Sequence, residues 1–190
     1  MRPINNAVLL SASPRRKALL RTFIKDLKVL VPKAKEVPVK TRRDLLINAR
    51  LKFSSVLAPK ADLVLSADTA VFLGKKVLGK PITPAKANRM LGQLSGKWHE
   101  VSTAMVLSIG RKKVETVVTT RVHFRKLDAK TIKAYVATGE PLDKAGAYGI
   151  QGRGSLFIDR IEGDYYNVVG LPIPKLEEIL EKNGYCLLRK

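Results

Sequence analysis

Cysteine is almost absent from this sequence of 190 residues, in which Cys186 stands alone. A lone cysteine forms no internal disulfide, and such usage is typical of a reducing compartment. Long hydrophobic runs are also missing: the longest extend over a few residues, as at positions 8–10, whereas a membrane-spanning helix needs about 20. Residues 1–6 lack the apolar stretch of a secretory signal. We therefore expect a cytoplasmic protein with no membrane partner.

Acidic residues are scarce, since Asp and Glu total 16 against 36 Lys and Arg, which gives a formal net charge of +20. A field of this sign attracts polyanions, which include nucleic acids, anionic membranes and phosphorylated small molecules. The basic residues form no run of five or six, which argues against a disordered nucleic-acid-binding arm. Aromatic residues make up 6% of the chain, and Trp98 lacks the stacking partners of a single-strand binder. A lysine-coated surface without a polyanionic partner is an equal alternative at this point.

Hydrophobic periodicity predicts alternating strands and helices in one α/β domain over residues 1–190. Ser13 before Pro14 is typical of a helix N-terminus, as is Asp128 before an apolar helical pattern. Two β-rich runs joined through residues 110–112 predict a hairpin, which makes the central twisted sheet mixed. We expect strands at residues 7–11, 27–31, 62–67, 70–73, 101–109, 114–124 and 185–188, and helices that begin near Pro14, Arg43, Pro84, Asp128 and Pro174. The last strand is expected to close the sheet.

The first segment with a chemical meaning is a strand that runs through a serine-containing turn into a helix, at Ser11-Ala12-Ser13-Pro14-Arg15-Arg16. Free N–H groups and the helix dipole at such a terminus favour an anion. Arg15 or Arg16 could add bidentate hydrogen bonds to phosphate oxygens. The alternative is a capped helix with solvated arginines.

A carboxylate and a lysine follow in two further segments. Asp68 and Thr69 lie where an apolar strand is expected to meet a turn, and a carboxylate at a strand end can bind Mg²⁺ or orient a water molecule. Lys80, between Gly79 and Pro81, could neutralise phosphate charge, although the upstream glycine spacing of a P-loop is missing. An Asp-Thr pair also caps turns, so each segment alone has a structural alternative.

A glycine-rich segment contains Gln151, which lies between Gly149 and Gly152. Glycine allows a ligand to approach the backbone closely. A glutamine amide offers one acceptor and two donors, and it therefore complements the N3–H and carbonyl edge of a uracil-type base. The alternative is a glycine-rich corner of the sheet on which Gln151 is merely exposed.

Together these segments resemble the Maf family of nucleoside triphosphate pyrophosphatases. The matching motifs occur in the family's order from about residue 8 to residue 174, at positions 11–16, 67–69, 78–81, 94–101 and 148–172. The resemblance implies an elongated α/β fold of the Maf and Ham1 type, with two lobes that flank a deep cleft. It also implies a reaction in which water attacks the α-phosphorus of a nucleoside triphosphate and releases pyrophosphate, with Mg²⁺ or another divalent cation such as Mn²⁺ as the cofactor.

Site roles follow from the motif positions of this family. The resemblance implies a catalytic set that consists of Asp68, Glu36, Lys52 and Lys80, and a metal held by Asp68 and Glu36. It implies substrate contacts from Ser11, Arg15, Arg16, Thr69 and Gln151. The stretch between Glu36 and Lys52 is short and atypical, and it reads Asn48-Ala49 where the family more often has Leu-Ala.

Thr69, Arg16 and Gln151 resemble the branch of the family that acts on dTTP and UTP, so the resemblance implies a pyrimidine nucleoside triphosphate as substrate. The resemblance also implies a homodimer. The alternative from another class is a basic nucleic-acid-binding or cell-division regulatory protein without catalysis, which rests on the net charge of +20 and on the family's older description as septum formation inhibitors. The complete set of Arg15, Asp68, Lys80 and Gln151 argues against that alternative.

Overall fold

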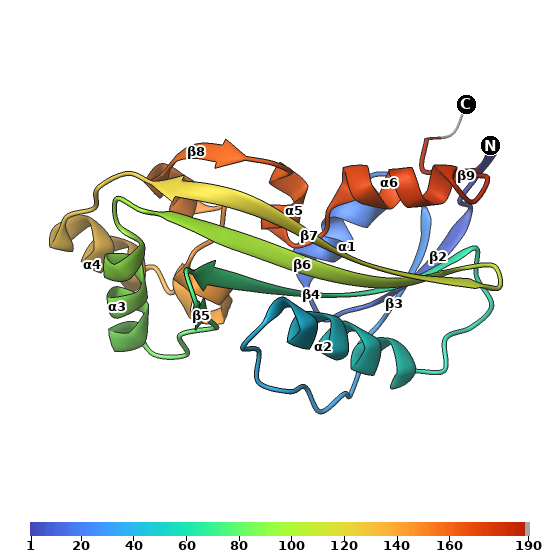
Figure 1. Ribbon diagram of the computed structural model, residues 1–190, viewed down its shortest axis with the longest axis horizontal. Helices are drawn as coiled ribbons and strands as arrows, with labels where there is room; N and C mark the ends of the chain where they lie inside the picture. The colour runs from blue at the N-terminus through green and yellow to red at the C-terminus, as the bar shows by residue number, and fades with distance from the viewer. Residues whose placement is uncertain (189–190) are drawn as a thin grey trace.

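Residues of high β-propensity fill two long neighbouring strands, β6 (Trp98–Ile109) and β7 (Lys112–Phe124), which run along most of the elongated molecule (Figure 1). They form an antiparallel hairpin in which Trp98 pairs with His123 and Ile109 pairs with Lys112. Gly110 makes the turn with a φ of 57°, a conformation that glycine adopts without strain. This computed structural model describes residues 1–188 of the predicted domain 1–190.

The main sheet combines parallel and antiparallel pairs, as predicted. Within residues 1–188 its strand order is β3-β2-β4-β6-β7-β8, and β5 pairs with β4 outside that path. β2 is parallel to both β3 and β4, whereas every pair from β4 to β8 is antiparallel. The other strands of this sheet are β2 (Asn6–Leu10), β3 (Asp26–Leu30), β4 (Leu63–Leu73), β5 (Lys76–Leu78) and β8 (Ile158–Glu162).

Side chains that cap backbone N–H groups fix where the helices begin. Ser13 accepts from the N–H of Arg16, and Asp128 accepts from the N–H of Thr131 at 2.7 Å. The α-helices of the described chain are α1 (Pro14–Arg21), α2 (Arg42–Ser54), α3 (Pro84–Leu94), α4 (Ala129–Ala137), α5 (Tyr165–Val169) and α6 (Ile173–Glu181). Three short 3-10 turns accompany them, η1 (Glu140–Asp143), η2 (Ala145–Ala147) and η3 (Arg153–Phe157). Over residues 1–188 we find no helix with the length and apolar character needed to cross a membrane.

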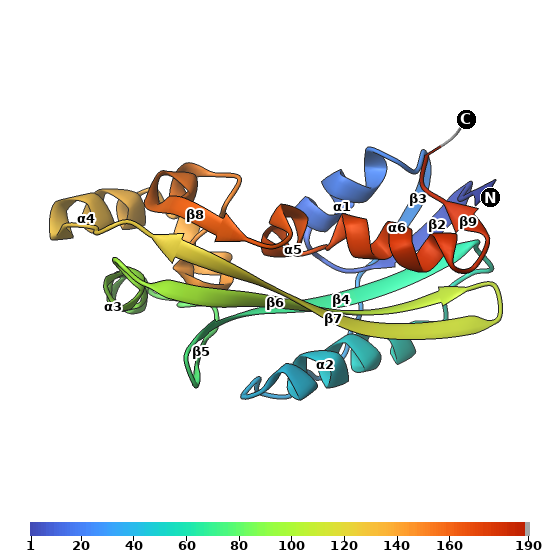
Figure 2. The same cartoon turned by 45° about the horizontal axis from the view of Figure 1, so that its top comes forward.

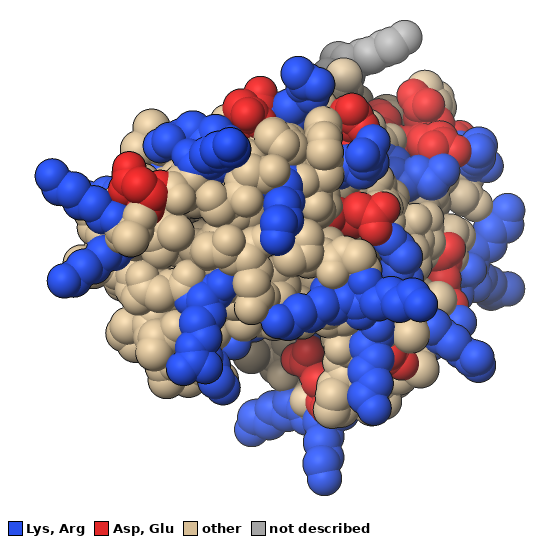
Figure 3. Space-filling view, turned by 60° about the vertical axis from the view of Figure 1, so that its left-hand side comes forward, with Lys and Arg blue, Asp and Glu red and all other residues tan. Residues whose placement is uncertain are grey.

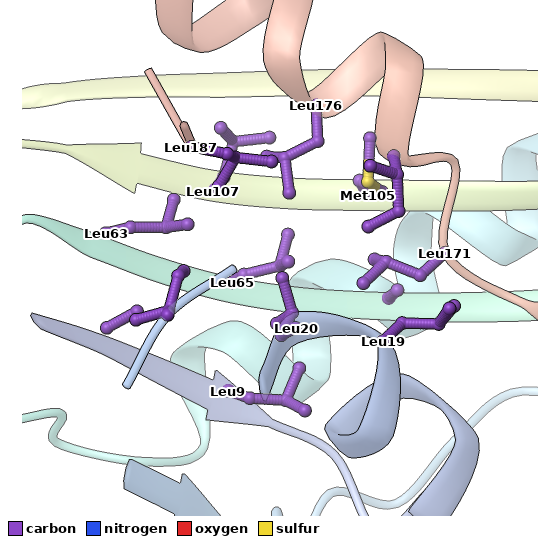
Figure 4. Packing of buried hydrophobic residues seen from close by; sticks show 14 of the residues in the cluster. Leu9, Leu19, Leu20, Leu63, Leu65, Met105, Leu107, Leu171, Leu176 and Leu187 are labelled. Atoms are coloured by element: carbon purple, nitrogen blue, oxygen red, sulfur yellow. The ribbon is translucent and has the colours of Figure 1, made fainter. Parts of the chain in front are cut away.

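The helices cover both faces of the sheet, and the buried residues form three clusters. Figure 2 shows α2 on one face of the sheet and α1, α5 and α6 on the other. Beneath α1 and α6, a cluster of leucines packs against β2, β4 and β6 (Figure 4), and it includes Leu9, Leu20, Leu65, Leu107 and Leu176. At the far end of the sheet a second cluster joins α3 and α4 to β4, β6 and β7, and it includes Val71, Leu91, Val101, Phe124 and Tyr135. A third cluster lies beneath α2 and includes Leu45 and Phe72. The predicted pair of lobes corresponds to the first two clusters.

The end of the chain departs from the prediction. β9 (Tyr185–Cys186) pairs in parallel with β1 (Arg2–Pro3) in a separate two-stranded sheet, so the expectation that the last strand closes the main sheet is wrong. The reason is that α6 returns the chain to the N-terminus, where the guanidinium of Arg2 lies over the ring of Tyr185 at 5.2 Å. The edge strands of the described main sheet remain β3 and β8.

Candidate active site

A cleft of about 520 Å³ lies between the two lobes. Its walls come from the β2–α1 loop, from the loop before α2 and that helix, from β4, and from the residues just after β5. Residues 143–145, 148–150 and 168–170 complete the lining. The cleft brings together eight of the nine predicted site residues, which are Ser11, Arg15, Arg16, Glu36, Lys52, Asp68, Thr69 and Lys80. The ninth, Gln151, is exposed and lies outside the lining, directly after Ile150, which is part of it.

The cleft begins where β4 loses one of its two neighbours. β2 pairs with β4 over residues 63–66, whereas β6 pairs with β4 as far as Phe72. Asp68 and Thr69 therefore lie inside a continuous strand, and the expectation that they mark a strand end at a turn is wrong. Pairing with β6 keeps the backbone extended, while the opposite edge opens just past the carboxyl end of β2.

Alternation along β4 sends neighbouring side chains to opposite faces of the sheet. Ser66 and Asp68 face α2, and the hydroxyl of Ser66 donates to the carbonyl oxygen of Ala49 in that helix at 2.7 Å. Ala67 and Thr69 belong to the other face, on the side of α1. Two adjacent residues thus connect the cleft to helices on both sides of the sheet.

Lys52, in the last turn of α2, holds two carboxylates together. Its Nζ lies 2.7 Å from Oδ1 of Asp68 and 3.1 Å from Oε2 of Glu36. The side chains of Lys52 and Asp68 are 12% and 13% exposed, whereas that of Glu36 is 48% exposed. The positive charge offsets the repulsion between two carboxylates that come from a strand and from the loop before α2.

Asn48 is a site residue that the sequence analysis missed. Its amide Nδ2 donates to the carbonyl oxygen of Val37 at 3.0 Å and to Oδ2 of Asp68 at 3.3 Å, and its Oδ1 accepts from the N–H of Val37 at 2.8 Å. One buried side chain, 1% exposed, therefore links the backbone beside Glu36 to Asp68. The signal was a polar residue at a position where the family more often has leucine.

Arg16 joins three of the segments that form the cleft. Its Nε donates to the carbonyl oxygen of Gly170 at 2.7 Å, and its Nη1 donates to Oγ of Ser11 at 3.2 Å and to the carbonyl oxygen of Ala67 at 2.8 Å. Its Nη2 donates to Oγ1 of Thr69 at 2.9 Å. Burial lowers the pKa of Arg16 to about 10, so the guanidinium is still charged at neutral pH. These four bonds use most of its five N–H donors.

Arg15 and Lys80 are the more accessible cations of the cleft. Arg15 is half-buried beside Arg16, and Lys80 is exposed after β5. The hydrogen bond from Lys144 is the main reason why the pKa of Asp143 is lowered, and the charge of Arg15 contributes as well. Arg15 and Asp143 both line the cleft. On the face shown in Figure 3, Lys and Arg side chains clearly outnumber Asp and Glu, so an anion approaches this face through a positive field.

Tyr148 forms part of the wall and is supported by a buried histidine. Its hydroxyl lies 2.8 Å from Nε2 of His99, which is 2% exposed. Burial lowers the pKa of His99 to about 4, so this imidazole is neutral at pH 7. Burial also raises the pKa of Tyr148, which keeps its hydroxyl protonated. The pair supports the wall without adding charge.

The carboxylates of the cleft suit a divalent cation such as Mg²⁺, which also coordinates phosphate oxygens. No group of three or more His, Cys, Asp or Glu side chains arranged for a metal occurs within residues 1–188. Glu36 and Asp68 nevertheless converge on the single ammonium of Lys52. Mg²⁺ commonly takes one or two carboxylates and completes its shell with water and substrate phosphates, so two converging carboxylates suit Mg²⁺, and the same oxygen ligands suit Mn²⁺.

Comparison with known proteins identifies the family of this chain. The family model described as Maf-like protein matches residues 6–183, and the chain therefore belongs to the Maf family. It is 45% identical over 183 residues to a Thermococcus gammatolerans protein named dTTP/UTP pyrophosphatase, an alignment that covers 96% of this chain and 99% of that one. It is 48% identical to a Thermococcus kodakarensis protein of the same name, over 90% of this chain and 95% of that one. A Moorella thermoacetica protein, also so named, is 46% identical over 93% and 94% of the two chains.

Proposed function

We propose that this protein is a nucleoside triphosphate pyrophosphatase that hydrolyses dTTP and UTP to the nucleoside monophosphate and pyrophosphate. The observation that carries this proposal is the convergence of Asp68, Glu36 and Lys52 in a cleft that also contains Arg15 and Lys80. The names of relatives that align with at least 90% of the chain support the same reaction and the same substrates.

Asp68 is the proposed general base. Water attacks the α-phosphorus, the bond from that phosphorus to the oxygen bridging it to the β-phosphorus breaks, and Asp68 accepts the proton of the attacking water. Lys52 and Asn48 orient the carboxylate through its two oxygens, at 2.7 and 3.3 Å. Negative charge grows on the departing pyrophosphate, and Arg15, Lys52 and Lys80 stabilise it more strongly in the transition state than in the bound substrate.

Asp68 and Glu36 are the proposed holders of Mg²⁺ or Mn²⁺. Bound there, the cation would supply charge neutralisation to the phosphates. The support for this proposal is that both carboxylates line the cleft and meet at Nζ of Lys52.

Some of the predicted substrate-binding residues are proposed to contact the nucleotide, and others mainly hold the wall of the cleft in place. Ser11 and Arg15 belong to the loop before α1 and are proposed to bind the phosphates. Arg16 and Thr69 are hydrogen-bonded to one another, so Arg16 mainly fixes the wall and offers its remaining Nη2 proton to the substrate. Gln151 is the proposed reader of the base, for which its exposed amide has both donors and an acceptor.

A panel of nucleoside triphosphates incubated with Mg²⁺ tests the function. We expect pyrophosphate and the monophosphate as products, with dTTP and UTP preferred to CTP and to the purine nucleotides. Release of single inorganic phosphate would indicate attack at the γ-phosphorus. Salt-sensitive DNA binding without pyrophosphate release from any nucleotide would instead favour the nucleic-acid-binding alternative.

Compartment and assembly are part of the proposal. We propose a cytoplasmic enzyme, which the single cysteine supports because free thiols are typical of a reducing compartment. We also propose a homodimer, on the resemblance to the family. Sedimentation equilibrium of the purified protein would distinguish a mass near 21.0 kDa from twice that mass.

A further inference from the structure

The segment that carries Gln151 is fastened by a single carboxylate behind the cleft. Oε2 of Glu140 accepts from the N–H of Arg153 at 3.0 Å, and Oε1 accepts from the N–H of Gly154 at 3.4 Å and from the hydroxyl of Tyr135 at 3.0 Å. Both backbone donors follow Gln151 by two or three positions. We call residues 149–154 the glutamine loop.

The fit between this carboxylate and the glutamine loop leaves no free space. A Cβ atom on Gly152 would lie 2.3 Å from Oε1 of Glu140, and one on Gly154 would lie 2.9 Å from the hydroxyl of Tyr135. The loop also closes on itself, because the N–H of Gly152 donates to the carbonyl oxygen of Gly149 at 3.3 Å. A Cβ atom at position 152 would therefore displace the carboxylate of Glu140 from the backbone N–H groups that it holds.

The same support extends to the wall of the cleft. Nζ of Lys144 donates to the main-chain oxygen of Glu140 and to Oδ1 of Asp143, each at 2.7 Å, and both Lys144 and Asp143 line the cleft. Burial and the neighbouring charge of Glu140 raise the pKa of Tyr135, so the phenol stays protonated and donates to the carboxylate. Glu140 does not itself line the cleft among the residues described.

We propose that Glu140 is a positioning residue that determines base selectivity by setting where the glutamine loop presents Gln151. This inference rests on the proposed function, in which Gln151 reads the base. Glu140 acts through the loop: Gly149 and Ile150 form the wall, Gln151 follows them, and the next two N–H groups are held by the carboxylate. A displaced loop would weaken recognition of the uracil edge without disturbing Asp68 and Lys52.

Glu140→Gln is the principal test, because it keeps the shape of the side chain but turns one acceptor into a donor that faces backbone N–H groups. We expect the KM for UTP to rise about tenfold and the kcat to change less than about twofold. The kcat/KM for CTP should change little, so the UTP-to-CTP selectivity should fall about tenfold. Gly152→Ala, which displaces the same carboxylate from the other side, should lower the selectivity in the same direction.

Glu177→Gln is the matched control. Oε2 of Glu177 also accepts from a backbone N–H, that of Leu187 at 2.9 Å, but in α6 and away from the cleft. We expect this variant to keep the wild-type selectivity. A double-mutant cycle with Gln151→Ala completes the test: if Glu140 acts through Gln151, Glu140→Gln adds little to the loss of selectivity already caused by Gln151→Ala.

Amide hydrogen exchange gives a readout that is independent of catalysis. Exchange at Arg153 and Gly154 should accelerate in Glu140→Gln, whereas exchange in β6 should not. If Glu140→Gln folds poorly, Tyr135→Phe removes one bond to the carboxylate and should shift selectivity in the same direction by a smaller factor.

Two outcomes would overturn the inference in different ways. An equal loss of kcat/KM for UTP and CTP, or an additive double mutant, would reduce Glu140 to a general structural role and leave the proposed function intact. A wild-type protein that releases no pyrophosphate from any nucleoside triphosphate would overturn the proposed function, and this inference with it.

Discussion

Nζ of Lys52 lies 2.7 Å from Oδ1 of Asp68, although one residue closes a helix and the other lies inside a strand. The pair includes Asp68, a group whose loss should abolish catalysis and leave the fold intact. Asp68→Asn keeps an acceptor for Lys52 but removes the proton-accepting carboxylate. We expect pyrophosphate release to fall about 10³-fold, within the usual range for a general base, and the thermal unfolding midpoint to stay within a few degrees.

Asp159→Asn is the control for that experiment, because Asp159 is a surface carboxylate that pairs with His123 at 2.6 Å. It should retain full activity. Retention of most activity by Asp68→Asn would remove Asp68 from the mechanism.

Asn48→Leu removes the amide that links the backbone beside Glu36 to Asp68, and it tests whether that link matters. The N–H and carbonyl groups of Val37 lose their side-chain partner, so we expect the free energy of unfolding to fall by about 1–3 kcal/mol. Because Asp68 also loses a hydrogen bond, we expect the kcat to fall about tenfold, with a smaller change in KM.

Asn88→Leu is the matched control, since Asn88 donates to the carbonyl oxygen of Pro84 on the outer face of α3. Asn48→Leu with reduced stability and an unchanged kcat would show that Asn48 serves folding alone.

Substitutions of the neighbouring residues Arg15 and Arg16 should have different effects, on kinetics for Arg15 and on stability for Arg16. Arg16→Lys cannot reproduce the four hydrogen bonds of the buried guanidinium, and we expect a loss of about 3 kcal/mol of unfolding free energy, roughly 6–12 °C in Tm. Arg15→Lys at a half-buried position should change stability by less than about 0.5 kcal/mol. It should lower kcat/KM for UTP about tenfold, because lysine cannot bind phosphate in a bidentate manner. Calorimetry and steady-state kinetics on both variants check the separation, and equal destabilisation would contradict it.

Acid should weaken the fold through His99. Its pKa is about 4 in the folded protein and 6.5 when unperturbed, so between these values the unfolded chain binds more protons. The contribution of neutral His99 to the free energy of unfolding is complete above pH 6.5. It is lost as the pH falls toward 4, and the loss totals about 3 kcal/mol.

Denaturant unfolding at several pH values between 7 and 4 measures this slope, and His99→Gln removes it. His123→Gln is the comparison variant, because the side chain of His123 is 26% exposed and its charge is the smallest of the causes that shift the pKa of His99. Parallel stability curves for the wild type and His99→Gln would contradict the assignment.

The local elements could be predicted because their signals are local. Ser13 before Pro14, Asp128 before α4, and the glycine between β6 and β7 each determine nearby backbone geometry, and the structure has a helix or a turn at each. The mixed sheet followed from the hairpin. The resemblance to the Maf family predicted Asp68, Glu36 and Lys52, and the contacts of Lys52 join residues 16 positions apart.

The features that the sequence did not predict depend on contacts between residues far apart in the chain. Asp68 looked like the end of a strand because a polar pair interrupts an apolar run, yet pairing with β6 carries β4 through it. The role of Arg16 depends on Gly170, which is 154 positions away, and no spacing rule connects them. Asn48 carried a visible signal, a polar residue at an apolar position, but its partner Val37 lies in a loop without regular structure.

The three longest strands pass through both lobes, with Leu65, Met105 and Leu107 packed in one core and Val71, Val101 and Phe124 in the other. The lobes therefore share a rigid hydrogen-bonded backbone in place of a flexible linker. A hinge rotation that closes the cleft, as in many two-domain enzymes, would have to bend these three strands or break hydrogen bonds between them. Any movement that encloses a nucleotide is consequently expected in the loop before α2 and in the segment between η1 and η3, and not between the lobes as rigid bodies.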